Sequence, residues 1–259
     1  MLCDSKKTDL DQFLPGFLYI CPVLKILKMD DILRYTACTL SSHHCRCFDT
    51  LTEEETKLLE KQSVTIKYKK GEVICKQGSF VSQVMYVERG LVKVFLDNGT
   101  NSLVLKIIPD GNLLGLASVS DDYNTYQYSA IAYIDSEIKQ IDIKLFRELI
   151  GRNPAFAKEV IDILSANSVQ IYGRFFCLTH KQAFGRLADI LLCLSERIFK
   201  QKEFELPLSR KDLAELSGMS SETVIRILKK FSEENLISMN GKTFTVHDYK
   251  RLQQISDKG

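Results

Sequence analysis

The hydrophobic pattern of this chain changes its period once, near residue 143, and this change constrains the fold more than any other feature. From residue 64 to 143, short runs of alternating apolar and polar residues are separated by glycine-containing turns. Runs of this kind, spaced by roughly 8–12 residues, predict the short strands of a β-sandwich or β-barrel. From residue 144 onward, apolar residues recur every three or four positions, which predicts helices. We therefore expect an α+β chain with its β domain first.

Residues 1–47 fit neither pattern. The apolar stretch at 13–27 is too short for a membrane helix and contains two prolines and Lys25. It also lacks the basic start and the small-residue cleavage site of a signal peptide. We expect an N-terminal extension that is partly disordered, or translation that starts at Met29. The protein is then expected in the cytoplasm, with no membrane partner.

The helical segment at 151–180 carries a second periodicity. Six residues there are spaced in alternating steps of four and three, and four of them are apolar and two polar: Val160, Leu164, Asn167, Ile171, Arg174 and Leu178. These steps are typical of a coiled-coil seam, in which a buried asparagine sets the register. One interpretation is the buried face of a single helix. We favour the other, a dimerisation helix with Asn167 at its seam.

Residues 208–231, LSRKDLAELSGMSSETVIRILKKF, predict two short helices around a glycine turn. Ser209 and Ser220 stand where helix N-caps belong, and Gly218 stands in the turn between them. The next residues predict two strands around Asn240-Gly241. This pattern is typical of a winged helix-turn-helix, whose second helix enters the major groove of DNA.

The outward face of the second helix supplies the candidate DNA contacts. Its candidate base-reading residues are Ser221, Glu222, Ile225 and Arg226. Arginine can donate two hydrogen bonds to guanine, and glutamate can accept one from cytosine N4. The candidate phosphate contacts are Ser209, Arg210, Ser220, Thr223 and Lys229. Lysine and arginine number 35 against 33 acidic residues, so the net charge of +2 neither indicates nor excludes a nucleic-acid partner.

Together these segments resemble the Crp/Fnr superfamily of bacterial transcription regulators. The matching motifs are Lys70-Gly71-Glu72-Val73-Ile74 with Gly78, the run from Tyr86 to Val94, Pro109 to Gly115, Arg186-Leu187-Ala188, and Leu208 to Leu228. The resemblance implies an N-terminal double-stranded β-helix, which is a cyclic-nucleotide-binding-like β-roll, then a long dimerisation helix and a C-terminal winged helix-turn-helix. The expected boundaries are 1–47, 48–150, 151–180 and 181–259.

The resemblance also implies a function. Family members bind palindromic promoter sites as homodimers, and many contact RNA polymerase. The glutamate and arginine that match Glu222 and Arg226 read a TGA-type half-site in the family. Ser221 and Ile225 depart from the residues that the family commonly has there, which leaves the outer bases of the half-site open.

The positions of the family's effector pocket differ from those of its cyclic-AMP-binding members. Those members carry a glutamate for the ribose and an arginine for the cyclic phosphate. Here the matching segments read Gly115-Leu116-Ala117 and Tyr128-Ser129-Ala130, so that only Ser129 fits. Losing the bidentate arginine removes the strongest phosphate contact. We expect an effector other than cyclic AMP, and a cyclic-nucleotide-responsive regulator is the less favoured alternative.

Three cysteines lie where the family's iron–sulfur members carry their cluster ligands. Cys38, Cys45 and Cys47 are candidate metal ligands, but the usual two-residue spacing is missing. Unliganded cysteines in a flexible segment are the simplest interpretation, with an iron–sulfur, zinc or heme sensor as the alternative. No catalytic constellation is present, and the paired glutamates are typical of solvated helix faces. We therefore expect a regulator, and not a ligand-binding module attached to an enzyme.

Overall fold

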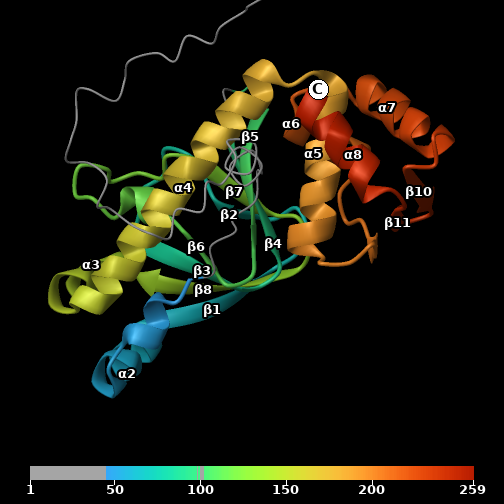
Figure 1. The fold of residues 1–259 in the computed structure, drawn as a ribbon. Coiled ribbons are helices and arrows are strands. Elements are labelled where there is room, and N and C mark those ends of the chain that lie inside the picture. The colour runs from blue at the N-terminus through green and yellow to red at the C-terminus, as the bar shows by residue number, and fades with distance from the viewer. Residues whose placement is uncertain (1–44, 98, 100–101) are drawn as a thin grey trace, which may run out of the picture.

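The structure, a computed structural model, describes residues 45–97, 99 and 102–259. Cys38, a candidate metal ligand, and most of the expected N-terminal extension lie outside these residues. Figure 1 shows a β-roll, a long helix beside it and a mainly helical C-terminal domain. No helix in the described part of the chain is long and apolar enough to cross a lipid bilayer.

The β-roll consists of two four-stranded antiparallel sheets. The first has the order β1 (Ser63–Tyr68), β8 (Ser136–Asp142), β3 (Gln83–Arg89) and β6 (Asn112–Leu114). The second has the order β2 (Val73–Cys75), β7 (Ser129–Ala132), β4 (Leu91–Asp97) and β5 (Ser102–Pro109). Fully buried side chains from both sheets, including Val87, Val92 and Ile138, fill the space between them. The alternating strands and their turns are thus confirmed.

Short helices cover the open side of the first sheet. A single 3₁₀ turn, η1 (Cys47–Thr50), precedes α2 (Glu53–Lys61), whose capping box joins Thr52 and Glu55 as expected. α3 (Ile143–Arg152) follows the last strand of the roll and ends before Pro154. A proline at the first position of a helix is favourable because its missing N–H is not needed there. The long helix α4 (Pro154–His180) therefore begins at this residue.

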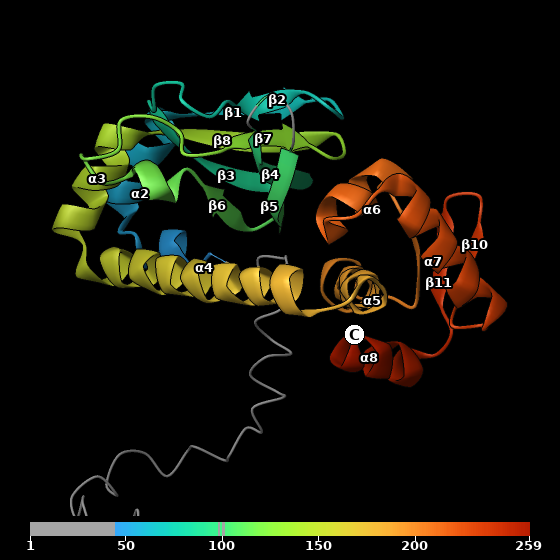
Figure 2. The same cartoon turned by 90° about the horizontal axis from the view of Figure 1, so that it is seen from above.

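α4 runs along one side of the roll (Figure 2). Its polar seam positions face the roll: Lys106 Nζ donates to Asn167 Oδ1 over 2.8 Å, and Arg174 Nη2 donates to the carbonyl of Val104 over 3.0 Å. Asn167 thus has a partner within its own chain, and its place on a dimer seam stays a prediction, because steps of three and four do not say which neighbour a helix face meets. An adjoining stripe of α4 is apolar and exposed. It includes the predicted seam residues Leu164 and Ile171, together with Ile161, Tyr172 and Phe175.

The C-terminal domain is built around the two short helices that the sequence predicts. Its elements are α5 (Ala183–Cys193), the π-helical turn η3 (Leu194–Ile198), β9 (Glu203–Glu205), α6 (Arg210–Ser217), α7 (Ser221–Glu233), β10 (Ile237–Asn240), β11 (Thr243–Val246) and α8 (Tyr249–Lys258). The hairpin of β10 and β11 turns at Gly241, as expected, and β9 adds a third strand to it. The arrangement is a winged helix-turn-helix.

Candidate nucleic-acid interface

Local capping interactions define both helices of the helix-turn-helix. At the start of α6, the Asp212 N–H donates to Ser209 Oγ over 3.1 Å and the Ser209 N–H donates to the Asp212 carboxylate over 2.8 Å. α6 ends at Gly218, which adopts a left-handed conformation with φ of 62° that favours glycine. Ser220 then caps α7 by accepting the Thr223 N–H. The turn thus follows from three residues that the sequence marks.

The two faces of α7 have opposite environments. Val224, Ile227 and Leu228 are buried, and they pack with Leu213 and Leu216 of α6. Glu222, Ile225, Arg226 and Lys229 are exposed on the other face, with Ser221 half-buried at its edge. The predicted division of α7 into a core face and an outward face is confirmed.

The outward face of α7 keeps its polar groups available. Arg226 forms no ion pair or hydrogen bond with any of the described residues. Hydrogen bonds from its own N–H and from the Ser220 hydroxyl hold the pKa of Glu222 below its usual range. Glu222 is therefore ionised near neutral pH and can only accept hydrogen bonds. An arginine donor and a carboxylate acceptor one helical turn apart suit recognition of neighbouring base pairs.

The five expected phosphate contacts are not equivalent. Lys229 is exposed and lies only loosely against Glu233, at 3.7 Å, so it is free to meet a phosphate. The hydroxyls of Ser209, Ser220 and Thr223 already take part in the helix caps. Arg210 is half-buried, with Nη2 3.4 Å from the Met239 sulfur, so it lies toward the wing.

One exposed basic residue of the wing was missed by the sequence analysis. Lys242 follows Gly241 at the tip of the β10–β11 hairpin. The Asn-Gly-Lys sequence that marks the turn is the signal that could have identified it, because the residues of a tight turn are usually exposed. Lysine side chains commonly contact DNA phosphates, so Lys242 is a further candidate for such a contact.

The four expected effector-pocket residues come together in the roll, where two of them contact each other directly. Tyr128 Oη accepts the Gly115 N–H over 2.7 Å. Ser129 Oγ accepts the Gln77 N–H over 3.0 Å, and Leu116 is buried in the core. Burial raises the pKa of the Tyr128 phenol, so it stays neutral. The Tyr128 hydroxyl is thus the acceptor for the backbone N–H of Gly115 in this turn.

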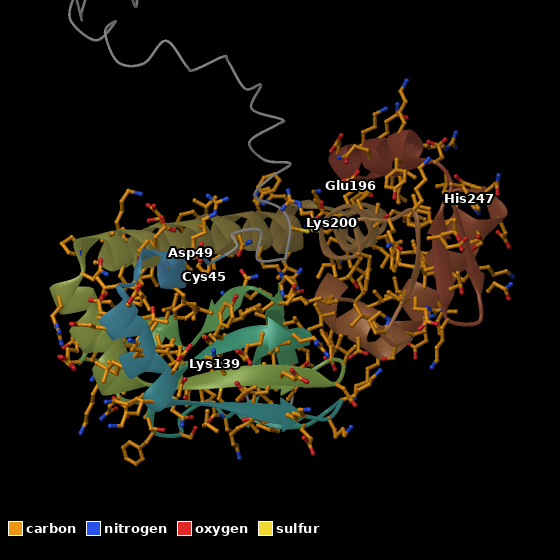
Figure 3. The ribbon with its side chains drawn as sticks, turned by 90° about the horizontal axis from the view of Figure 1, so that it is seen from below. Cys45, Asp49, Lys139, Glu196, Lys200 and His247 are labelled. Carbon is orange, nitrogen blue, oxygen red and sulfur yellow. The ribbon has the colours of Figure 1, made fainter. Side chains whose placement is uncertain are left out.

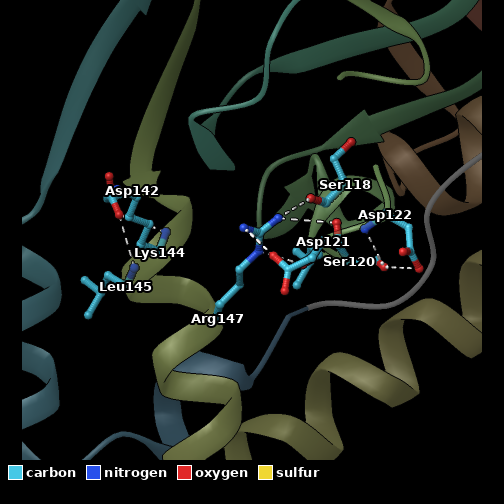
Figure 4. A network of polar contacts seen from close by, with 9 residues as sticks. Ser118, Ser120, Asp121, Asp122, Asp142, Lys144, Leu145 and Arg147 are labelled. Atoms are coloured by element: carbon cyan, nitrogen blue, oxygen red, sulfur yellow. Dashed lines mark hydrogen bonds and ion pairs between the residues drawn. The ribbon is translucent and has the colours of Figure 1, made fainter. Parts of the chain in front are cut away.

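The chain after Leu116 is tied to α3. Arg147 Nε donates to the Val119 carbonyl over 2.7 Å, and its Nη2 donates to the carbonyls of Ser118 and Ser120 (Figure 4). The same guanidinium forms an ion pair of 2.8 Å with Asp121. A planar guanidinium with several donors holds such a loop well. The Gly115 turn is therefore fixed on both sides.

The expected metal ligands do not form a cluster site in the described residues. Cys45 and Cys47 are both buried. Cys45 lies beside α4 (Figure 3), and its N–H donates to the Gly111 carbonyl. Their hydrogen bond to each other and burial raise the pKa of the Cys47 thiol. Cys75 lies apart in β2, and Cys38 is outside the described residues. No three histidine, cysteine or acidic side chains of the described part could hold a metal ion. The expectation that Cys45 and Cys47 lie in a flexible segment is wrong, because both pack into the core.

Two family models match the chain. The model described as a cyclic nucleotide-binding domain matches residues 65–153, and the one described as a Crp-like helix-turn-helix domain matches residues 185–255. They correspond to the roll with α3 and to the segment from α5 to α8.

Curated relatives are similar to this chain in sequence, and a solved structure has a similar fold. The transcriptional activator protein anr of Pseudomonas aeruginosa is 29% identical over 70% of this chain and 75% of its own length. The cAMP-activated global transcriptional regulator CRP of Escherichia coli O6:H1 is 28% identical over 70% of this chain and 88% of its own length. FixK2 from Bradyrhizobium japonicum has a similar fold, with a TM-score of 0.68 at 20% identity, covering 74% of this chain and 96% of that one.

Proposed function

This chain belongs to the Crp/Fnr family of transcription regulators, and on that premise we propose that it binds palindromic promoter DNA as a homodimer under the control of an effector other than cyclic AMP. Its matched relatives are regulators and not enzymes, and no enzymatic activity is proposed. The observation that carries the proposal is the outward face of α7, where Glu222, Ile225 and Arg226 are exposed while the opposite face is buried.

The residues of this face have distinct proposed roles. Arg226 donates to guanine O6 and N7, and Glu222 accepts from cytosine N4. Ile225, with 52% of its surface exposed, suits contact with a thymine methyl group, and Ser221 reads the edge of the half-site. Ser209, Arg210, Ser220, Thr223 and Lys229 contact phosphates, together with Lys242 of the wing.

The apolar stripe of α4 supports the homodimer. Tyr172 and Phe175 have 69% and 67% of their surface exposed, which is unusual for side chains of their size. A second copy of α4 would cover both stripes in a two-fold interface, and two-fold symmetry matches a palindromic site. Because the matched relatives include transcriptional activators, we also propose contact with RNA polymerase, in the cytoplasm.

The effector assignment rests on the Gly115 turn. Leu116 and Tyr128 stand where the cyclic-AMP-binding members have a glutamate and an arginine, and the Tyr128 hydroxyl accepts the Gly115 N–H. Without a guanidinium, the turn offers no charged partner to a cyclic phosphate. The alternative, an iron–sulfur or heme sensor, has little support from the described cysteines, of which only Cys45 and Cys47 lie together.

DNA binding at several salt concentrations tests the proposal. A duplex selected by the protein from a random library is compared with a random duplex of the same length, by fluorescence anisotropy. We expect the selected duplex to be palindromic and to bind at least about 1000-fold more tightly, with both affinities falling as salt rises. Equal affinity for both duplexes would contradict sequence-specific regulation. Sedimentation of the wild type and a Phe175→Glu variant tests the dimer, which the variant should weaken.

A further inference from the structure

The roll and the helix-turn-helix share one continuous buried cluster. It includes Leu91 and Ile107 of the roll together with Leu208 and Leu213 at α6. Figure 2 shows α6 between the end of the roll and α7. α6 thus connects α7 to the roll, and the geometry of this joint contributes to the direction of α7, which α5 also contacts.

A buried ion pair crosses the joint. Lys93 of β4 and Glu215 of α6 approach to 2.7 Å, and only 9% and 20% of their side-chain surfaces are exposed. The Lys93 ammonium also lies 5.6 Å from the ring centre of Tyr133, whose buried hydroxyl has no hydrogen-bond partner among the described residues. A second contact lies just before α6, where Lys70 Nζ donates to the Pro207 carbonyl over 2.9 Å.

Buried ion pairs contribute more to geometry than to stability. The cost of removing both charges from water offsets most of their attraction, so apolar replacements are often as stable. The short hydrogen bond of a charged pair is directional, however, whereas packed apolar side chains tolerate sliding. A pair at the centre of an apolar joint therefore selects one orientation among several of similar packing energy.

The joint leaves the reading face open. Glu222, Ile225 and Arg226 remain exposed while Lys93 contacts Glu215, so this contact does not mask the DNA-binding surface. The roll is in turn held to α4 by the bonds from Lys106 to Asn167 and from Arg174 to Val104. A chain of polar contacts thus runs from α4 through the roll to α6.

We propose that Lys93 and Glu215 are positioning residues that fix α7 relative to α4, and thereby set the spacing of the two half-sites that the dimer accepts. This inference rests on the proposed function, since it takes α4 as the dimer interface. Base preference within each half-site depends on α7 alone, whereas the distance between half-sites depends on how each α7 is held. The two properties are therefore separable.

The test compares affinities for the selected palindromic duplex and for duplexes with one base pair inserted or deleted between its half-sites. The variants are Lys93→Met, which removes the buried ammonium, and the double variant Lys93→Met/Glu215→Met, which removes both charges. The measured quantity is the ratio of the affinity for the selected duplex to the affinity for a duplex with altered spacing. In each variant we expect this ratio to be about tenfold smaller than in the wild type. Base preference within the half-site should stay unchanged, and thermal unfolding should show that the double variant remains folded.

The matched control is Lys67→Met, which breaks the exposed pair of Lys67 and Glu137 within the roll. It should keep wild-type discrimination between spacings. If the double variant discriminates as the wild type does, apolar packing alone positions α6 and the inference is overturned. If the wild type selects no palindromic duplex, the proposed function fails first, which distinguishes the two failures.

Discussion

The reading face of α7 and the Gly115 turn of the roll treat their polar groups in opposite ways. On α7, Arg226 has no partner among the described residues and Glu222 is ionised and exposed. In the roll, the Tyr128 hydroxyl accepts the Gly115 N–H and Ser129 accepts the Gln77 N–H. The Arg226 guanidinium, which has no internal partner among the described residues, is available to an external one, whereas the Gly115 turn satisfies its own donor. The difference agrees with the proposed function, in which the exposed face of α7 binds DNA and the Gly115 turn does not bind cyclic AMP.

The largest expected effect is a loss of stability from a substitution on the buried face of α7. Ile227→Ala should lower the free energy of unfolding by about 2–5 kcal/mol, because it leaves a cavity at a side chain that is fully buried. Urea unfolding of the wild type and the variant measures this difference.

The control is the same substitution on the opposite face of the helix. Ile225→Ala should change stability by less than about 0.5 kcal/mol, while altering the base preference of the selected duplex. Similar losses of stability from both variants would show that Ile225 is not an exposed reading residue.

Arg226→Ala tests the proposed base contact on the exposed face of α7. It should weaken binding by about 1–3 kcal/mol and relax preference at one base pair of each half-site, because the bidentate contact to guanine is lost. Affinities for a set of single-base-pair variants of the selected duplex reveal this pattern. Lys229→Ala is the comparison variant, since a phosphate contact should weaken all duplexes alike and flatten the salt dependence. A uniform loss with Arg226→Ala would contradict base reading.

Lys106, like the Gly115 turn, has a hydrogen-bond partner within the chain, because its ammonium donates to Asn167. Burial lowers the pKa of Lys106 from its ordinary value of 10.5 to about 8. The folded state therefore binds fewer protons than the unfolded state between these values, and wild-type stability should rise with pH there. Relative to Lys106→Met, the wild type should gain about 2 kcal/mol between pH 7 and pH 9.5, measured by urea unfolding. A constant difference between the two proteins would show that Lys106 is solvated.

Tyr128→Phe has the smallest expected effect. Removing the hydroxyl leaves the Gly115 N–H without its acceptor and should destabilise the roll by about 1 kcal/mol, with no change in DNA affinity. Tyr123→Phe, at an exposed tyrosine of the same domain, should leave stability unchanged. Equal effects of the two substitutions would argue against a structural bond from Tyr128 to Gly115.

Local signals explain what the sequence could predict. The caps at Ser209 and Ser220 and the left-handed Gly218 act within a few residues, so the helix-turn-helix was readable from its sequence. The alternating sequence and the glycine turns likewise mark β1, β3 and β4 as strands, although the burial does not follow the alternation: β1 has no buried residue, and the first four residues of β4 are all buried. Both signals depend only on neighbouring residues.

Features that depend on distant partners could not be read in this way. β9 is a three-residue strand that exists through its pairing with β11, some forty positions later. The spacing on α4 suggested a seam at Asn167, but the partner of this residue is Lys106 of the roll. The pairs of Tyr128 with Gly115 and of Lys93 with Glu215 depend in the same way on the assembled fold.

The most direct test of the contrast between the two regions is the affinity for the selected palindromic duplex with and without saturating cyclic AMP. An open reading face and a Gly115 turn without phosphate contacts predict salt-dependent, sequence-specific binding that cyclic AMP changes by less than about twofold. Binding that rises tenfold or more on addition of cyclic AMP would contradict the account, since the roll would then accept the ligand that its side chains are inferred to exclude.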